Sequence, residues 1–321
     1  MRRLVICLAL LIAALPARAQ QAAYPDRPIR MVIPFAPGGA ADVVGRITAQ
    51  AMSEDLGQPV VVENRGGSGG IIGSQAALQA PADGYTIVLH TLSSGVMNAG
   101  LYRSMPFDLH RAFAPVGLVG TVPNIIVVNP GVPARTLQDL IALVRANPGR
   151  ITYASSGPGT IVHLSGHLLA NAIGAEMVHV PYRGSGPALA DLMAGTVQVM
   201  VDTLPPYVAL VQSGQVRALA MASATRSAAL PDVPTAAEAG LPGYETNNWH
   251  GIFVATGTPA PVIARLERAL RNGIAAPATR QRLISLGVDP RGTGAEELAT
   301  FWDEQFRIWI PIIRASGATA E

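Results

Sequence analysis

The sequence contains no lysine, because all 23 basic residues among its 321 are arginine. This absence excludes Schiff-base chemistry on a lysine and the phosphate-binding lysine of a P-loop. Neither G-x-G-x-x-G nor G-x-x-x-x-G-K-[ST] occurs, so a nucleotide has no dedicated binding loop. We therefore expect no cofactor, and any cationic contact to a ligand has to come from arginine or histidine.

Cysteine is almost absent as well, since Cys7 is the single one. It lies in the apolar run 4–15, which follows two arginines and precedes the A-x-A pattern at 17–19, as in a secretory signal. We predict a signal peptide over 1–19, cleaved before Gln20, and an exported mature chain without disulfides. Twelve apolar residues are fewer than the roughly 20 of a membrane span, and no later run reaches that length, so we expect a soluble mature protein.

Excess charge of either sign is also missing. Without the three arginines of the predicted signal, 20 basic residues stand against 21 acidic ones, which gives no basic patch for a nucleic acid. With 321 residues, 49% of them hydrophobic, the chain is long enough for two domains with ample cores.

Short apolar runs alternate with amphipathic segments in the first part of the chain. The predicted strands are 29–33, 59–63 and 85–89, with helices ending near 56 and 79. This alternation is typical of a parallel α/β sheet, whose ligands bind at the carboxyl ends of the strands. The loops at Pro37, Gly67 and Thr91 should therefore lie on one edge.

A second alternation begins after the apolar stretch 116–128. The predicted helices are 137–146, 161–173, 187–193 and 207–212, and the predicted strands are 151–154, 177–180, 197–201 and 216–222. A short helix from Thr235, a strand at 249–254 and the tail helices 259–272, 278–286 and 293–314 follow. Because no further strand is predicted, the tail helices should pack on the first unit. We expect one domain of 24–122 with 247–321 and a second of 123–246.

Two glycine turns each join a predicted strand to a predicted helix. The segment 34–42 (PFAPGGAAD) contains Gly38 and Gly39, and the segment 153–160 (YASSGPGT) contains Gly157. Glycines let the backbone approach a ligand, and the free N–H groups at a helix start favour an anion. We interpret the two turns as the two sides of one anion-binding cleft.

Two motifs favour other functions. The segment 66–70 (GGSGG) matches the G-x-S-x-G pattern of serine hydrolases, with Ser68 as nucleophile, but such a match is common in a glycine cluster. His163 and His167 have the i, i+4 spacing of a zinc site, but Leu164 stands where H-E-x-x-H has its glutamate. We expect no metal site, and we expect His163 to line the cleft or to hydrogen-bond its rim.

Several ordered motifs make the chain resemble the extracytoplasmic receptors of tripartite tricarboxylate transporters, also called the Bug family. They include 34–42, 62–70 (VENRGGSGG), 81–86 (PADGYT), 156–164 (SGPGTIVHL) and 180–184 (VPYRG). The resemblance implies an α/β fold of the type II periplasmic binding protein class, two domains joined by a double crossover, and no catalysis. It implies a carboxylate held by the two glycine turns. The residues so implied are Pro37, Gly38, Gly39, Asp42, Ser156, Gly157 and Thr160, with Ser68, Thr91 and Asp202 as pocket wall.

The resemblance further implies a monomeric periplasmic receptor that delivers its ligand to membrane permease subunits. A di- or tricarboxylate, an amino acid and an aromatic carboxylate all stay open as ligands. Presentation of the ligand to a membrane sensor kinase also stays open as the role.

Overall fold

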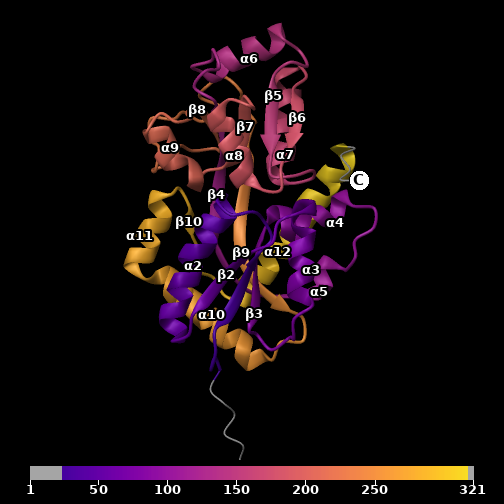
Figure 1. Ribbon diagram of the computed structural model, residues 1–321, viewed down its shortest axis with the longest axis vertical. Coiled ribbons are helices and arrows are strands. Elements are labelled where there is room, and N and C mark those ends of the chain that lie inside the picture. The colour runs from indigo at the N-terminus through magenta and orange to yellow at the C-terminus, as the bar shows by residue number, and fades with distance from the viewer. Residues whose placement is uncertain (1–23, 317–321) are drawn as a thin grey trace, which may run out of the picture.

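The computed structural model describes residues 24–316, so the predicted signal peptide lies outside the described residues. Two lobes share one sheet that runs through both of them (Figure 1). Its strands are β1 (Ile29–Ile33), β2 (Val60–Asn64), β3 (Thr86–Thr91), β4 (Phe113–Val128), β5 (Thr152–Ser155), β6 (Val178–Pro181), β7 (Val199–Thr203), β8 (Arg217–Ala222), β9 (Asn247–Ala255) and β10 (Asp289–Pro290). The main path follows the order β2-β1-β3-β9-β4-β7-β5-β6, with β8 and β10 paired to β4.

The long strand β4 belongs to both lobes, because it changes partners along its length. Phe113 to Pro123 pair with β9 in the first lobe, whereas Asn124 to Val128 pair with β7 and β8 in the second lobe. The first lobe thus contains β1, β2, β3, β9 and β10, and the second contains β5, β6, β7 and β8. The strands β4 and β9 carry the chain between the lobes (Figure 1).

The prediction of a parallel sheet is wrong in part. β1, β2 and β3 are parallel, so their carboxyl ends share one edge as expected. β9, however, inserts between β3 and β4 and is antiparallel to both, and β4 is antiparallel to β7 and β8. The sheet is therefore mixed, because the chain returns from the second lobe in the opposite direction.

Helices cover the faces of the sheet in both lobes (Figure 1). They are α2 (Ala40–Leu56), α3 (Ile71–Leu78), α4 (Asn98–Leu101), α5 (Leu109–Ala112), α6 (Leu137–Ala146), α7 (Ile161–Ile173), α8 (Ser185–Ala194), α9 (Val208–Gln212), α10 (Ala260–Ala275), α11 (Pro277–Ser285) and α12 (Ala295–Ser316). Short turns of helix also occur at Ser68–Gly70, Ser93–Met97 and Pro205–Tyr207. As predicted, the tail helices pack on the first lobe, α10 against α2 and α12 against β4 and α4.

Aromatic residues of the last helix complete the core of the first lobe. Trp302 is 2% exposed and its Nε1 donates to the carbonyl oxygen of Gly95 over 2.7 Å. Trp249 is 1% exposed and packs on Phe253 and Phe301. It is a core residue.

The predicted short helix from Thr235 is wrong. The hydrogen bonds of a capping box form there, since Thr235 N donates to Glu238 and Glu238 N donates to Thr235 Oγ1. The following residues are turns, because Gly240 adopts a φ of 86° and Pro242 follows it.

Candidate ligand-binding site

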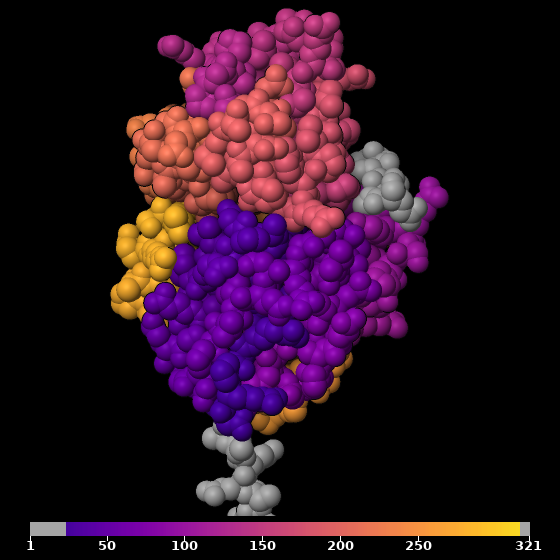
Figure 2. Space-filling model, viewed as in Figure 1, coloured from indigo at the N-terminus to yellow at the C-terminus, as the bar shows by residue number. Residues whose placement is uncertain are grey.

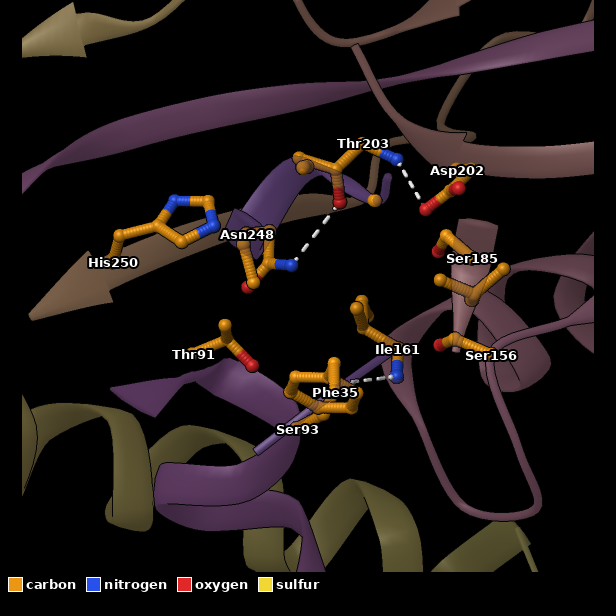
Figure 3. A pocket seen from close by; sticks show the side chains of 14 residues that line it. Phe35, Thr91, Ser93, Ser156, Ile161, Ser185, Asp202, Thr203, Asn248 and His250 are labelled. Atoms are coloured by element: carbon orange, nitrogen blue, oxygen red, sulfur yellow. Dashed lines mark hydrogen bonds between the residues drawn. The ribbon is translucent and has the colours of Figure 1, made fainter. Parts of the chain in front are cut away.

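A cavity lies where the two lobes meet, at the ends of β1, β3 and β7 and beside β9 (Figure 3). Its volume is about 30 Å³. It is lined by Phe35, Gly39, Ala40, Ala41, Thr91, Ser93, Ser156, Ile161, Val162, Ser185, Asp202, Thr203, Asn248 and His250. None of these residues is lysine or arginine, so a ligand charge has to be balanced by other groups.

Three helices begin at this cavity. Ala40 starts α2, Ile161 starts α7 and Ser185 starts α8, and all three residues line the space. No side chain caps α2 or α8, which leaves backbone N–H groups of their first turns without a side-chain acceptor. The positive ends of three helix dipoles therefore meet at one place, which favours an anion.

The lobes contact each other directly beside the cavity, along the seam in Figure 2. A Cβ atom placed on Gly186 would lie 1.9 Å from the carbonyl oxygen of Pro37. The turn 34–42 of the first lobe therefore packs on the segment 182–186 of the second. Sequence analysis paired this turn only with 153–160, and the structure adds 182–186 as its direct neighbour.

Hydrogen bonds also cross between the lobes. Ile161 N, at the start of α7, donates to Ser93 Oγ over 3.0 Å. Asn248 on β9 accepts from Leu92 N over 3.1 Å through Oδ1 and donates to Thr203 Oγ1 over 3.1 Å through Nδ2. The wall of the cavity is thus built from groups that connect the first lobe to the second.

Four of the predicted site residues line the cavity, namely Gly39, Thr91, Ser156 and Asp202. They come from four separate segments of the chain, which the fold brings together.

Pro37, Gly38 and Asp42 do not line it. The carboxylate of Asp42 accepts from Gly38 N over 3.1 Å and from Arg46 Nε over 3.0 Å. These bonds tie the turn to the first part of α2. In this structure the N–H of Gly38 is therefore engaged by the chain itself.

Gly157, Thr160 and His163 support the second turn from outside the lining. Thr160 Oγ1 donates to the carbonyl oxygen of Gly157 over 2.8 Å and Thr160 is fully buried. His163 Nδ1 accepts from Gly159 N over 3.2 Å, and its ring stacks on His179 at a centroid distance of 4.0 Å. His163 therefore packs beneath the turn.

Ser68 lies at a second, more superficial cavity that also contains Gly157 and Arg183. Its φ of 46° is in the left-handed region, which is uncommon for a residue other than glycine. Within 24–316 no hydrogen bond joins its hydroxyl to a histidine. A serine hydrolase needs that contact, so the geometry gives the hydrolase interpretation no support.

The side chain of His167 contacts that of Asn171, with 3.1 Å between His167 Nε2 and Asn171 Nδ2. Across the described part of the chain, no group of three or more His, Cys, Asp or Glu residues could hold a metal ion.

Sequence reasoning missed four polar residues of the lining, which are Ser185, Thr203, Asn248 and His250. A signal existed for Ser185, because it follows β6 and a glycine and starts a helix, as Ala40 follows β1 and Gly39. No local signal marks Asn248 or His250, since both lie within a strand.

Asp202 is buried in the cavity wall with 1% exposure. Burial raises its pKa, against the opposing effect of hydrogen bonds from Thr203 N–H, Ser185 and Tyr207. The Tyr207 hydroxyl donates over 2.9 Å and Thr203 N over 2.7 Å. With these donors in place, Asp202 orients Ser185 and so the start of α8.

Among the residues from 24 to 316, none of the helices has the length and apolar character to cross a membrane.

Comparisons with known proteins agree with this architecture. Residues 44–318 match the model of the tripartite tricarboxylate transporter family receptor. Protein BugT of Bordetella pertussis is 35% identical over 321 residues, covering 99% of this chain and 98% of that protein. The structure of Rhodopseudomonas palustris Rpa4515 with adipate has a TM-score of 0.88 at 33% identity, covering 92% of this chain and 99% of that one.

MatC of Rhodopseudomonas palustris, solved with bound malate, has a TM-score of 0.85 at 31% identity and covers 90% of this chain and 100% of that one. These similarities confirm the predicted fold class of a periplasmic binding protein. The chain therefore belongs to the tripartite tricarboxylate transporter receptor family, also known as the Bug family.

Proposed function

We propose that this protein captures a small carboxylate in the cavity between its lobes and acts as a periplasmic receptor without catalysing a reaction. The observation that carries the proposal is the meeting of three helix starts, those of α2, α7 and α8, at a cavity without lysine or arginine. Backbone N–H groups and hydroxyls there can hold a carboxylate by charge-assisted hydrogen bonds. We assign Gly39 and Ser156 to the carboxylate.

The relatives support the same ligand class. Rpa4515 was solved with adipate and MatC with malate, and both ligands are dicarboxylates. For the chain studied here, we infer that one carboxylate lies at the helix starts. The remaining part of the ligand then faces the first-lobe strands.

We infer that binding closes the cleft. In the closed form Ile161 N reaches Ser93 and Pro37 reaches Gly186, and water leaves the space between the lobes. Loss of water strengthens each hydrogen bond to the charged ligand, and the ligand shifts the population toward the closed form.

We propose that 24–122 with 247–321 moves as one body and 123–246 as the other. Monomeric protein then presents the closed form to membrane permease subunits.

A thermal-shift panel tests the ligand class. The panel contains mono-, di- and tricarboxylates, amino acids and nicotinate. A ligand present at about 100 times its dissociation constant stabilises the folded state by about 2.7 kcal/mol, so a carboxylate should raise Tm clearly. A Gly39→Val variant should lose this shift because its side chain would crowd Ser185, whose Cβ lies 3.0 Å from the Cβ position of residue 39.

An unchanged Tm with every carboxylate, or an equal shift in the Gly39→Val variant, would contradict the assigned site. Delivery to a permease is tested separately, by carboxylate uptake in cells with and without the receptor gene.

A further inference from the structure

Two side chains of the cavity carry polar atoms without any hydrogen-bond partner. They are Thr91, through Oγ1, and His250, through both ring nitrogens. Thr91 is 3% exposed and His250 is fully buried. A buried polar atom left unpaired costs about 1 to 3 kcal/mol, so such atoms usually have a partner. Because both residues line the cavity, a molecule that enters it can supply that partner.

The fold places these two residues side by side. Thr91 ends β3 and His250 lies on β9, and they are directly opposite each other in the antiparallel pair. Opposite residues of such a pair project to the same face of the sheet. Other buried polar atoms without a partner, on His90, Asn98, Asn124 and Trp249, belong to residues that do not line the cavity.

The pair lies apart from the helix starts. Figure 3 shows Thr91 and His250 on one side of the cavity and Ser156, Ser185 and Asp202 on the other, with Ile161 between them. If the carboxylate of a ligand lies at the helix starts, the end of the ligand away from that carboxylate therefore lies near Thr91 and His250.

The chemistry of the pair is that of a neutral site. Burial lowers the pKa of His250 to about 3, so the ring is uncharged near neutral pH and has one donor and one acceptor. The hydroxyl of Thr91 is also both donor and acceptor. The remaining titratable group of the lining is Asp202, and the neighbouring His90 on β3 is buried with its pKa lowered to about 3. No positive charge is available here for a second carboxylate.

Resting on the proposed function, we propose that Thr91 and His250 form a specificity site for a neutral hydroxyl or carbonyl group on the carboxylate ligand. The ligand class is then a hydroxy- or oxo-carboxylate, chosen over the parent acid of the same length. A site built to pair a hydroxyl discriminates strongly against the analogue that lacks it, because its own buried groups are then left unpaired.

Calorimetry with matched acids tests this proposal. The probes are succinate against malate, and butyrate against its 2-hydroxy, 3-hydroxy, 4-hydroxy and 2-oxo derivatives. At least one hydroxy or oxo acid should bind 10-fold or more tightly than its parent. Thr91→Val, which keeps the shape, and His250→Phe should each remove most of that preference, so that the hydroxy or oxo acid and its parent acid bind with affinities within about threefold of each other.

Thr48→Val is the matched control, because Thr48 is a buried threonine of α2 whose hydroxyl already donates to Val44 O over 2.9 Å. It should keep the preference. The Tm of ligand-free Thr91→Val should equal or exceed that of the natural protein, and a Tm lowered by several degrees would give Thr91 a structural role and overturn the proposal.

Two other outcomes would overturn it. One is equal binding of parent and hydroxylated acids by the natural protein. The other is tightest binding of an unsubstituted dicarboxylate with proton uptake, which would make His250 a charged partner. Failure of every acid to bind would instead contradict the proposed function itself.

Discussion

Gly186 lies at a point where the structure leaves no room for a side chain. A Cβ atom there would lie 1.9 Å from the carbonyl oxygen of Pro37, across the boundary between the lobes. Gly186 is also the second residue of α8, where alanine favours the helix over glycine by about 1 kcal/mol. Contact between the lobes therefore requires glycine at this position, whereas the stability of α8 by itself favours alanine.

We predict that Gly186→Ala leaves the ligand-free protein as stable as before but weakens carboxylate binding 10-fold or more, because the lobes cannot close. Urea denaturation and calorimetry measure the two quantities. Gly131→Ala is the control, since its added Cβ meets only the Asn129 side chain, at 3.0 Å, and should leave affinity unchanged. Unaltered affinity in Gly186→Ala would argue against closure at this contact.

Residue types reveal function where they act locally. Gly39 and Ser156 were predictable because each stands between a strand and a helix. Asp42 was predicted as a site residue on the same basis, yet its carboxylate bonds to Gly38 N and Arg46. The direction of a side chain at a helix start depends on its neighbours in space, which the local pattern does not contain.

At the scale of elements, capping patterns show how far local sequence reaches. Thr136 and Asp139 form a capping box at the start of α6. Thr235 and Glu238 form the same bonds, but no helix follows them. Gly240 has a positive φ, which ends the helical conformation of the backbone. The last helix was predicted from residue 293, whereas α12 begins at Ala295.

The second glycine turn rests on stacked rings from β5, β6 and α7. Tyr153 stacks on His179 at 5.0 Å and His179 on His163 at 4.0 Å, while Ser155 Oγ lies 2.6 Å from His179 Nε2. Burial, together with the nearby His179 and His167, lowers the pKa of His163 to about 4, and burial also lowers the pKa of His179. Both rings are therefore kept neutral in the folded protein.

This arrangement predicts a loss of stability in acid. Between the unfolded pKa of about 6.5 and the folded pKa of about 4, the unfolded chain binds protons that folded His163 does not. Its contribution is therefore complete above pH 6.5 and is lost as the pH falls toward 4. Urea midpoints measured from pH 7.5 to 4.5 should decline less steeply in His163→Phe, which keeps a ring for stacking.

The His163→Phe variant should still show a residual decline, due to the buried rings of His90 and His250. His167→Gln, four residues further along the same helix, is the control and should follow the natural curve more closely. If the urea midpoints of His163→Phe and of the natural protein decline with equal slopes as the pH falls, His163 does not contribute to the loss of stability in acid.

At the scale of the whole molecule, β4 and β9 make a two-stranded connection between two lobes that touch along one seam (Figure 2). Opening the seam breaks the contact of Pro37 with Gly186 and the bond from Ile161 to Ser93. It leaves the pairing within each lobe intact. The proposed opening therefore breaks contacts between the lobes and keeps the strands of each lobe paired.

Distance measurements between spin labels test this motion. The single natural cysteine, Cys7, lies in the predicted signal, so Ile72→Cys and Met193→Cys would be the only thiols of a chain starting at residue 24. Both positions are exposed, at 49% and 38%, and lie on α3 and α8. We predict that a bound carboxylate narrows and shifts their distance distribution.

The control pair is Ile72→Cys with Ile308→Cys on α12, which belongs to the same lobe and should show no shift. Identical distributions with and without ligand across the lobes would contradict hinge closure. A shift in the control pair would contradict the division into 24–122 with 247–321 and 123–246.

The sequence by itself determined the family, the strand-turn-helix units and the glycine turns at the helix starts. These properties depend on residues within about one helical turn of each other, through glycine turns and periodic apolar positions. Tertiary structure alone decided that β9 runs antiparallel between β3 and β4, that Gly186 faces Pro37, and that Thr91 lies opposite His250. Such partnerships join segments more than 100 residues apart, and the hydrophobic and hydrogen-bonding energies that select them arise only when the chain is packed.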